Sequence, residues 1–306
     1  MQSAVRFCLR SYRKLSESVR YLIVNADDLG LSRAINRGIL EAHLDGVVSS
    51  TTVLVNMPYA REGIELIQTR APELGLGLHI NLTYGEPLSA PKDVPSLVQL
   101  DGRFVSVTRG LFSPRRWQAS DVKRELTRQL EHFQALTGTL PDHLDSHQLI
   151  GSLSPTCREV MLDIAERYNL PMRRGGRATF ALFEEEVVKQ VPWSKRLAPR
   201  VFQSWPMERH KYIYDRDVVQ PDFLETRFFD KGSTLTTLLN ILGDLPPGIT
   251  ELVCHPGYAE SSPVDAYKMR EVELRILTSE SVKQKLKQEK IELINFGDLQ
   301  AKSLEN

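Results

Sequence analysis

The sequence lacks both a long apolar run and a useful set of cysteines. None of its apolar stretches approaches the roughly 18 residues that a membrane-spanning helix needs, so we expect no membrane span. Its three cysteines, Cys8, Cys157 and Cys254, are odd in number and widely spaced. This pattern argues against a disulfide framework and against a cysteine-rich zinc site. A protein of the reducing cytoplasm is therefore expected.

The chain also lacks a net charge. Lysine plus arginine and aspartate plus glutamate each number 39, and the two signs are interspersed along the sequence. A protein that follows a nucleic acid backbone needs a basic face. We therefore expect no nucleic acid partner.

The length of 306 residues and an apolar content of 41% are sufficient for one large core. We expect a single catalytic domain over residues 20–306. Residues 1–19 are basic and carry no acid before Glu17, so they are expected to form an arm outside the domain. The arm resembles an organelle transit peptide in its composition, although it has no apolar signal-peptide core. A frayed basic arm is the simpler alternative.

The chain is organised around residues 20–32, RYLIVNADDLGLS. The β-prone residues 21–24 predict a buried strand that ends at Ala26, so that Asp27 and Asp28 lie at its carboxyl end. Ser32 then begins a helix, which makes a βα unit. The alternative is a simple turn capped by the Asp28 side chain.

Three further predicted strands end in the same kind of polar residue. The alternating run 74–82 contains His79, the short strand 141–145 is followed by His147, and the run 249–254 is followed by His255. Asp145 and His147 alternate on one face of the short strand. Catalytic residues of α/β barrels gather at the carboxyl ends of the strands, so we predict an irregular (β/α) barrel. The alternative for His79 is a histidine that pairs with a backbone carbonyl.

The remaining elements are read from periodicity and from turn residues. Strands are expected at 47–57, 170–174 and 291–294, a hairpin at 98–105, and helices at 60–69, 120–136, 155–168, 233–242, 267–278 and 282–289. Residues 175–232 break the rhythm. We interpret them as an irregular insertion that forms a cap, a substrate loop or an oligomer contact, for example in a homodimer.

Taken together, the polar residues at the strand ends could form a site for metal-assisted hydrolysis. One carboxylate and two neutral imidazoles can hold a divalent ion and leave coordination positions open. A second carboxylate can accept a proton from water, and a further histidine can protonate a leaving group. Such a site would hydrolyse an amide or an ester. Zinc, cobalt or nickel suits the histidines, and mixed oxygen ligation also admits magnesium.

At these residues the chain resembles the YdjC-like carbohydrate deacetylases, relatives of the polysaccharide deacetylases. The resemblance runs from about residue 21 to the carboxyl terminus, and its motifs are NADDLGLS with NRGILEAH, GVVSSTTVLVN, GLGLHINLT with GEPLS, DHLDSH and ELVCHPGY. It implies an irregular (β/α) barrel. It also implies metal-dependent removal of an acetyl group from an N-acetylated amino sugar such as a chitooligosaccharide, with Mg²⁺ or Zn²⁺ as the ion.

The resemblance assigns roles to five residues. Asp28 matches the metal-binding aspartate, His79 and His147 match the two histidine ligands, Asp27 matches the general base, and His255 matches the general acid. The roles of Asp27 and Asp28 could be exchanged. The chain departs from the family pattern at residues 148–151, QLIG, where relatives usually carry further histidines, and in its long amino-terminal arm.

Two rival functions are left open by the sequence. The first is deacylation of another N-acyl amine, such as an amino-sugar lipid headgroup. The second is carbohydrate binding with little catalysis, caused by the altered segment after His147. Retention of all five polar residues argues against the second alternative, because buried polar groups are costly to keep without a role.

Overall fold

The computed structural model describes residues 19–107, 117–175, 216–259 and 269–304. Its strands are β1 (Arg20–Leu29), β2 (Ser50–Val53), β3 (Gly75–Ile80), β4 (Leu144–Ser146), β5 (Phe223–Glu225), β6 (Gly248–Cys254) and β7 (Ile291–Leu293). Its α-helices are α2 (Arg33–Leu44), α3 (Ala60–Arg70), α5 (Ala119–Thr137), α6 (Ile150–Leu153), α7 (Pro155–Tyr168), α10 (Leu235–Gly243), α11 (Arg270–Leu277), α12 (Glu280–Gln288) and α13 (Phe296–Leu304).

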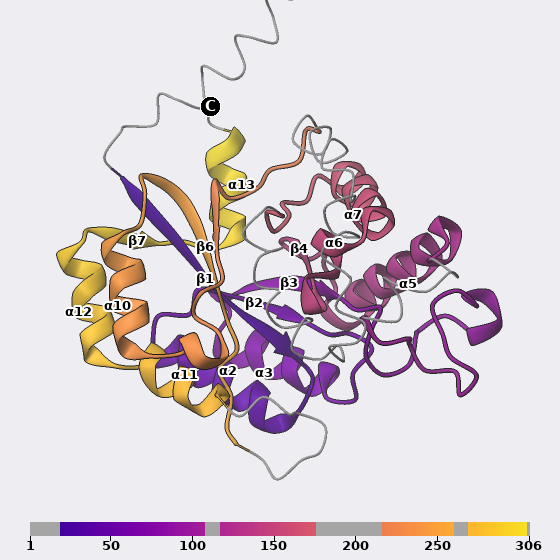
Figure 1. Ribbon diagram of the computed structural model, residues 1–306, viewed down its shortest axis with the longest axis horizontal. Coiled ribbons are helices and arrows are strands. Elements are labelled where there is room, and N and C mark those ends of the chain that lie inside the picture. Colours follow the sequence, from indigo (N-terminus) through magenta and orange to yellow (C-terminus); the bar gives the residue numbers. More distant parts are fainter. Residues whose placement is uncertain (1–18, 108–116, 176–215, 260–268, 305–306) are drawn as a thin grey trace, which may run out of the picture.

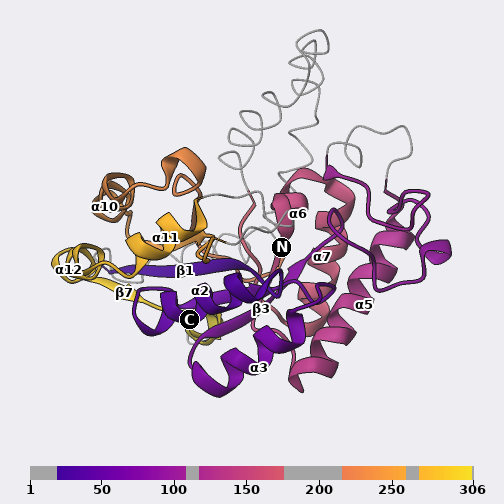
Figure 2. The same cartoon turned by 90° about the horizontal axis from the view of Figure 1, so that it is seen from below.

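The strands form one parallel sheet that curls into an incomplete barrel. Their order is β4-β3-β2-β1-β6-β5, and β7 pairs with the first residues of β1. Helices lie outside the strands, with α10, α11 and α12 on one side and α5 and α7 on the other (Figures 1 and 2). The predicted irregular (β/α) barrel is therefore confirmed. No helix in the described ranges has the length and apolarity required to cross a bilayer.

Two extended segments continue the barrel wall beyond β4. Met172 forms a parallel bridge with Leu144 of β4, and the Met172 amide donates a hydrogen bond of 2.9 Å to the Val219 carbonyl. The next residue, Arg173, is held by its own amide, which donates to the Leu144 carbonyl. The wall beside β4 thus carries a buried arginine.

The two ends of the barrel differ in polarity. Near the start of the strands, Ile23 of β1 and Ile249 of β6 pack with Phe296 and Leu299 of α13 in a separate apolar cluster. The opposite end carries the buried polar residues at the carboxyl ends of the strands, including Asp27 and others described below. Apolar side chains therefore seal one end, and the other end is left for chemistry.

Most predicted elements are confirmed, with different bounds. β1 runs to Leu29 instead of ending at Ala26, because the strand continues through a bulge where its register with β2 shifts. The helix expected from residue 233 begins at Leu235, with the Thr234 side chain accepting from the amide of its third residue. The expected hairpin is present as an antiparallel bridge between Val98 and Phe104.

The two irregular regions of the sequence are only partly covered. The arm at 1–18 and residues 176–215 of the expected insertion lie outside the described residues. The described remainder of the insertion is not wholly irregular, because it contains β5, which pairs with β6 in parallel. That strand was missed because its three residues are too few to show a period.

Gly77 of β3 tests the packing inside the barrel. A Cβ at this position would lie 2.3 Å from the buried His143 ring, which is stacked on Phe296 and cannot move away freely. We expect Gly77→Ala to lower the free energy of unfolding by about 1–3 kcal/mol, measured by urea denaturation. Gly243→Ala is the control, because its Cβ would meet only the flexible end of Lys285 at 3.4 Å. Equal stabilities of the two variants would contradict this packing.

Candidate active site

A bulge in β1 brings two neighbouring carboxylates to the same side. In a regular strand the side chains of adjacent residues point to opposite faces of the sheet. Between Ala26 and Leu29 the pairing with β2 shifts, and Asp28 takes a positive φ of 76°. A bulge re-aims side chains in this way. Asp27 and Asp28 are consequently both buried at the carboxyl end of the barrel.

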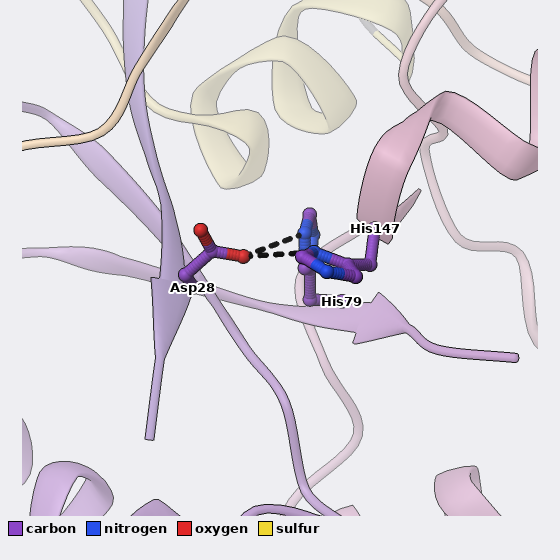
Figure 3. A group of neighbouring side chains, drawn as sticks. All are labelled: Asp28, His79 and His147. Carbon is purple, nitrogen blue, oxygen red and sulfur yellow. Dashed lines mark hydrogen bonds and ion pairs between the residues drawn. The ribbon is translucent and has the colours of Figure 1, made fainter. Parts of the chain in front are cut away.

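Asp28 faces two histidines from other strands. Its Oδ1 lies 3.0 Å from Nδ1 of His147 and 3.4 Å from Nε2 of His79. Figure 3 shows one carboxylate oxygen directed at both rings. The three residues offer ligand atoms that all lie within 4.8 Å of one another. One carboxylate and two imidazoles form a donor set that suits a divalent ion, so the structure brings together the three residues that the sequence singled out for a metal.

His79 is oriented by partners on its other ring nitrogen. Its Nδ1 lies 2.6 Å from Oδ1 of Asp145 and 3.1 Å from Oγ1 of Thr52. These contacts turn Nε2 toward Asp28. A histidine ligand held by a carboxylate through its second nitrogen is typical of metal sites. Asp145, which the sequence placed on one strand face with His147, thus contacts His79.

Arg173 links three buried carboxylates. Its NH1 and NH2 donate to both oxygens of Asp27 at 2.9 and 2.7 Å, and NH2 also lies 2.9 Å from Asp145. Its Nε donates to Glu251 of β6 at 2.7 Å. A second possible metal group, formed by Asp27, His79 and Asp145, is disfavoured because the guanidinium already lies against both of its carboxylates. No pattern in the sequence singled out Arg173 as a site residue.

The aspartates are held in their ionised form. Burial alone would raise the pKa of Asp27, but Arg173 and then His79 lower it below its ordinary value. Burial would likewise raise the pKa of Asp28, and Arg270 of α11, whose NH2 lies 2.6 Å from Oδ2, leads the opposing effects and leaves it lowered. Both carboxylates are therefore charged at neutral pH.

His79 has the opposite shift. Burial would lower its pKa, but Asp145 and then Asp27 outweigh burial and raise it from 6.5 to about 10. In the metal-free protein, His79 therefore carries a proton at neutral pH. A metal ion that binds at Nε2 has to displace that proton.

His255 lies on the Asp27 side of the site. Its Nε2 is 3.9 Å from Oδ2 of Asp27, and its backbone amide donates to the Glu273 carboxylate. The ring of Phe229 meets the His255 ring edge-on at 5.1 Å, and Tyr84 meets His147 at 6.3 Å. The fifth residue singled out in the sequence thus joins the other four, and two aromatic rings border the group.

The proton on His79 makes the stability of the metal-free protein depend on pH. Because its pKa is raised from 6.5 to about 10 on folding, its contribution to stability is complete below pH 6.5 and is lost as pH rises to about 10. We expect the free energy of unfolding of the chelator-treated wild type, measured by urea denaturation, to exceed that of His79→Gln. This difference should become smaller as the pH rises across this range. A constant difference between the two proteins would contradict the raised pKa.

Together the fold and the site define an α/β barrel with a buried cluster of aspartates and histidines at the carboxyl ends of its strands. A family model described as YdjC-like protein matches residues 21–288. The chain belongs to this family.

Named relatives align over nearly the whole chain. A carbohydrate deacetylase from Thermoanaerobacter pseudethanolicus is 33% identical over 287 residues, covering 92% of this chain and 100% of the relative. A carbohydrate deacetylase from Geobacillus stearothermophilus is 34% identical over 283 residues, covering 91% and 98%. A crystal structure from Enterococcus faecalis V583, described as a candidate cellobiose-phosphate cleavage protein, is 30% identical with a TM-score of 0.77 and covers 92% of this chain and 99% of its own.

Proposed function

We propose that this protein is a carbohydrate deacetylase that hydrolyses the N-acetyl group of an amino sugar, with a chitooligosaccharide-like substrate and a divalent ion. The carbohydrate deacetylases from Thermoanaerobacter and Geobacillus support the activity, since they align over more than nine tenths of this chain. The observation that carries the proposal is the Asp28, His79 and His147 cluster with the ionised Asp27 beside it. A donor set that suits a metal, with a separate ionised carboxylate beside it, supports metal-assisted hydrolysis.

The proposed ion site consists of Asp28, His79 and His147. Their donor chemistry fits a divalent ion, and the hold of Asp145 on the far nitrogen of His79 leaves Nε2 for coordination. An ion bound there would supply Lewis acidity toward the acetyl oxygen and toward a water molecule. Zn²⁺ and Mg²⁺ are both compatible with the oxygen and nitrogen donors.

Asp27 is the proposed general base. Arg173 donates to both of its oxygens and keeps the carboxylate ionised and fixed in position. A carboxylate whose two oxygens both accept hydrogen bonds from a guanidinium is a poor metal ligand, whereas Asp28 directs Oδ1 at both histidines. This contrast favours Asp28 as the ligand and Asp27 as the base over the exchanged assignment.

His255 is the proposed general acid. Hydrolysis of an amide must expel an amine, which is a poor leaving group unless it is protonated. The Nε2 of His255 lies beside Asp27, 3.9 Å from its Oδ2, at the edge of the cluster. A proton held at this nitrogen could be donated to the amine nitrogen of the sugar.

The two aspartates can be separated by amide substitution. Asp27→Asn removes the proton acceptor, so we expect turnover to fall by about 10² or more while bound metal is retained. Asp28→Asn should instead weaken metal binding. Metal content by elemental analysis, alongside the rate of acetate release, distinguishes the variants. If Asp27→Asn loses the ion and Asp28→Asn keeps it, the two roles are exchanged.

Phe229 is the proposed contact for the sugar ring. Its side chain is 39% exposed although it lies 5.1 Å from the His255 ring. An aromatic face offers apolar area on which a pyranose ring can stack. The exposed ring next to the proposed acid supports a sugar as the group that leaves.

We expect Phe229→Ala to raise KM for an N-acetylated disaccharide about fivefold with little change in kcat, which corresponds to a lost contact of about 1 kcal/mol. Phe223→Ala is the matched control, because Phe223 is 42% exposed and lies on β5. Equal changes in the two variants would contradict a role of Phe229 in sugar binding.

A substrate panel tests the function directly. Metal-loaded and chelator-treated protein would be incubated with N-acetylated chitooligosaccharides, an N-acetylated amino-sugar lipid headgroup and cellobiose phosphate. We expect acetate release and the mass loss of one acetyl group from a chitooligosaccharide, only with metal. Acetate from the headgroup alone would move the proposal to another N-acyl amine. Glycosidic cleavage without acetate, or binding without turnover, would overturn deacetylation.

A further inference from the structure

The first turn of helix α11 contacts both Asp28 and the turn that carries His255. Arg270 and Glu273 are three residues apart, so their side chains lie on one face of the helix. Both are buried, with 4% and 0% of their surface exposed. Long charged side chains are almost never fully buried unless they are paired. Their partners therefore explain why these charges lie inside the molecule.

Arg270 contacts the proposed metal ligand. Its NH2 donates to Oδ2 of Asp28 at 2.6 Å, the oxygen that does not face the histidines. This contact fixes the plane of the carboxylate, so that Oδ1 is the oxygen presented to His79 and His147. The guanidinium also donates to the His255 carbonyl at 3.5 Å.

Glu273 holds the turn that carries His255. One of its oxygens accepts from the His255 amide, and the other accepts from Oγ of Ser233 at 2.7 Å. The Gly257 amide donates to the Arg270 carbonyl at 3.3 Å and fixes the other side of the same turn. The backbone of the turn also packs closely on α2, since a Cβ on Gly38 would lie 2.5 Å from the Gly257 Cα. The imidazole is therefore placed through its backbone.

We propose that Arg270 and Glu273 are positioning residues that set the proposed acid, His255, in register with the proposed metal ligand, Asp28. The inference rests on the proposed function. Neither side chain has to touch the substrate. The first turn of α11 acts as a rigid link, because Arg270 holds Asp28 and Glu273 holds the loop that carries His255. A link of this kind matters because a small misplacement of a catalytic group is costly to the rate.

Glu273→Gln tests the link. In this variant one carboxylate oxygen becomes an NH₂ group, so a single acceptor oxygen remains for the His255 amide and Ser233, and the hydrogen bond that remains is no longer charge-assisted. The His255 turn should loosen while the metal ligands stay intact. We expect hydrolysis of an N-acetyl sugar to fall about tenfold more than hydrolysis of an aryl acetate, whose leaving group needs no proton. Metal content should be unchanged.

The matched control is Glu271→Gln. Glu271 lies in the same first turn and carries the same charge, but it is only half-buried. It should behave as the wild type on both substrates. Ser233→Ala is a milder second variant that removes one donor to Glu273 and leaves the carboxylate in place. It should shift the substrate ratio in the same direction by a smaller factor.

Hydrogen exchange provides a readout that does not depend on turnover. The His255 amide is hydrogen-bonded to Glu273, so peptides covering residues 254–257 should exchange faster in Glu273→Gln than in the wild type or in Glu271→Gln. This measurement can be made on metal-free protein. It reports on the hydrogen bond itself.

His255→Gln separates failure of the inference from failure of the proposed function. If His255→Gln shows the substrate split and Glu273→Gln does not, the positioning role is overturned. If His255→Gln loses activity equally on the N-acetyl sugar and the aryl acetate, the proposed acid role of His255 is wrong. Hydrogen exchange at residues 254–257 then tests the positioning role by itself. Faster exchange in Glu273→Gln would support Glu273 as the residue that holds the turn, and unchanged exchange would overturn it.

Discussion

The contact between Arg173 and three buried carboxylates is the interaction on which the site depends. Asp27, Asp145 and Glu251 come from three different strands, and without a cation these buried carboxylates would repel one another. The guanidinium has donors in a rigid fork and keeps its charge when buried. It therefore holds the three carboxylates in position. Removing one partner of such a network leaves charges buried and uncompensated.

This network accounts for the protonation of the metal-free site. Four carboxylates, Asp27, Asp28, Asp145 and Glu251, face two guanidiniums and the His79 imidazolium, which leaves one net negative charge among these seven groups when all are ionised. A divalent ion that displaces the His79 proton would make the same set neutral. The proton on His79 and the proposed ion would therefore compensate the same negative charge.

The sequence predicted the parts of the site that lie directly at strand ends. A β-prone run that stops at Asp27 and Asp28, or at His255, can be recognised because a strand exit is a local pattern. The bulge at Asp28 could not be predicted, because it depends on the register with β2. Arg173 falls within the predicted strand 170–174, which is reduced to a single bridge at Met172, and no local pattern indicates that its side chain reaches Asp27 and Asp145.

Contacts across the fold were also invisible in the sequence. Arg270 and Glu273 lie on a predicted helix, but nothing local indicates that their buried side chains reach β1 and the turn after β6. The barrel itself was predictable because repeated βα units admit few arrangements. The partners of long charged side chains are set by the tertiary structure, and no spacing rule reveals them.

Asp28, His79 and His147 are proposed to hold a divalent ion beside an uncoordinated Asp27. A crystal structure of the zinc-loaded protein, with the ion located by anomalous scattering, tests it most directly. We expect one peak at about 2.0–2.2 Å from an oxygen of Asp28 and from one nitrogen of each histidine. Asp27 should remain on Arg173. A peak coordinated by Asp27 and Asp145, or no ordered ion among these residues, would contradict the account.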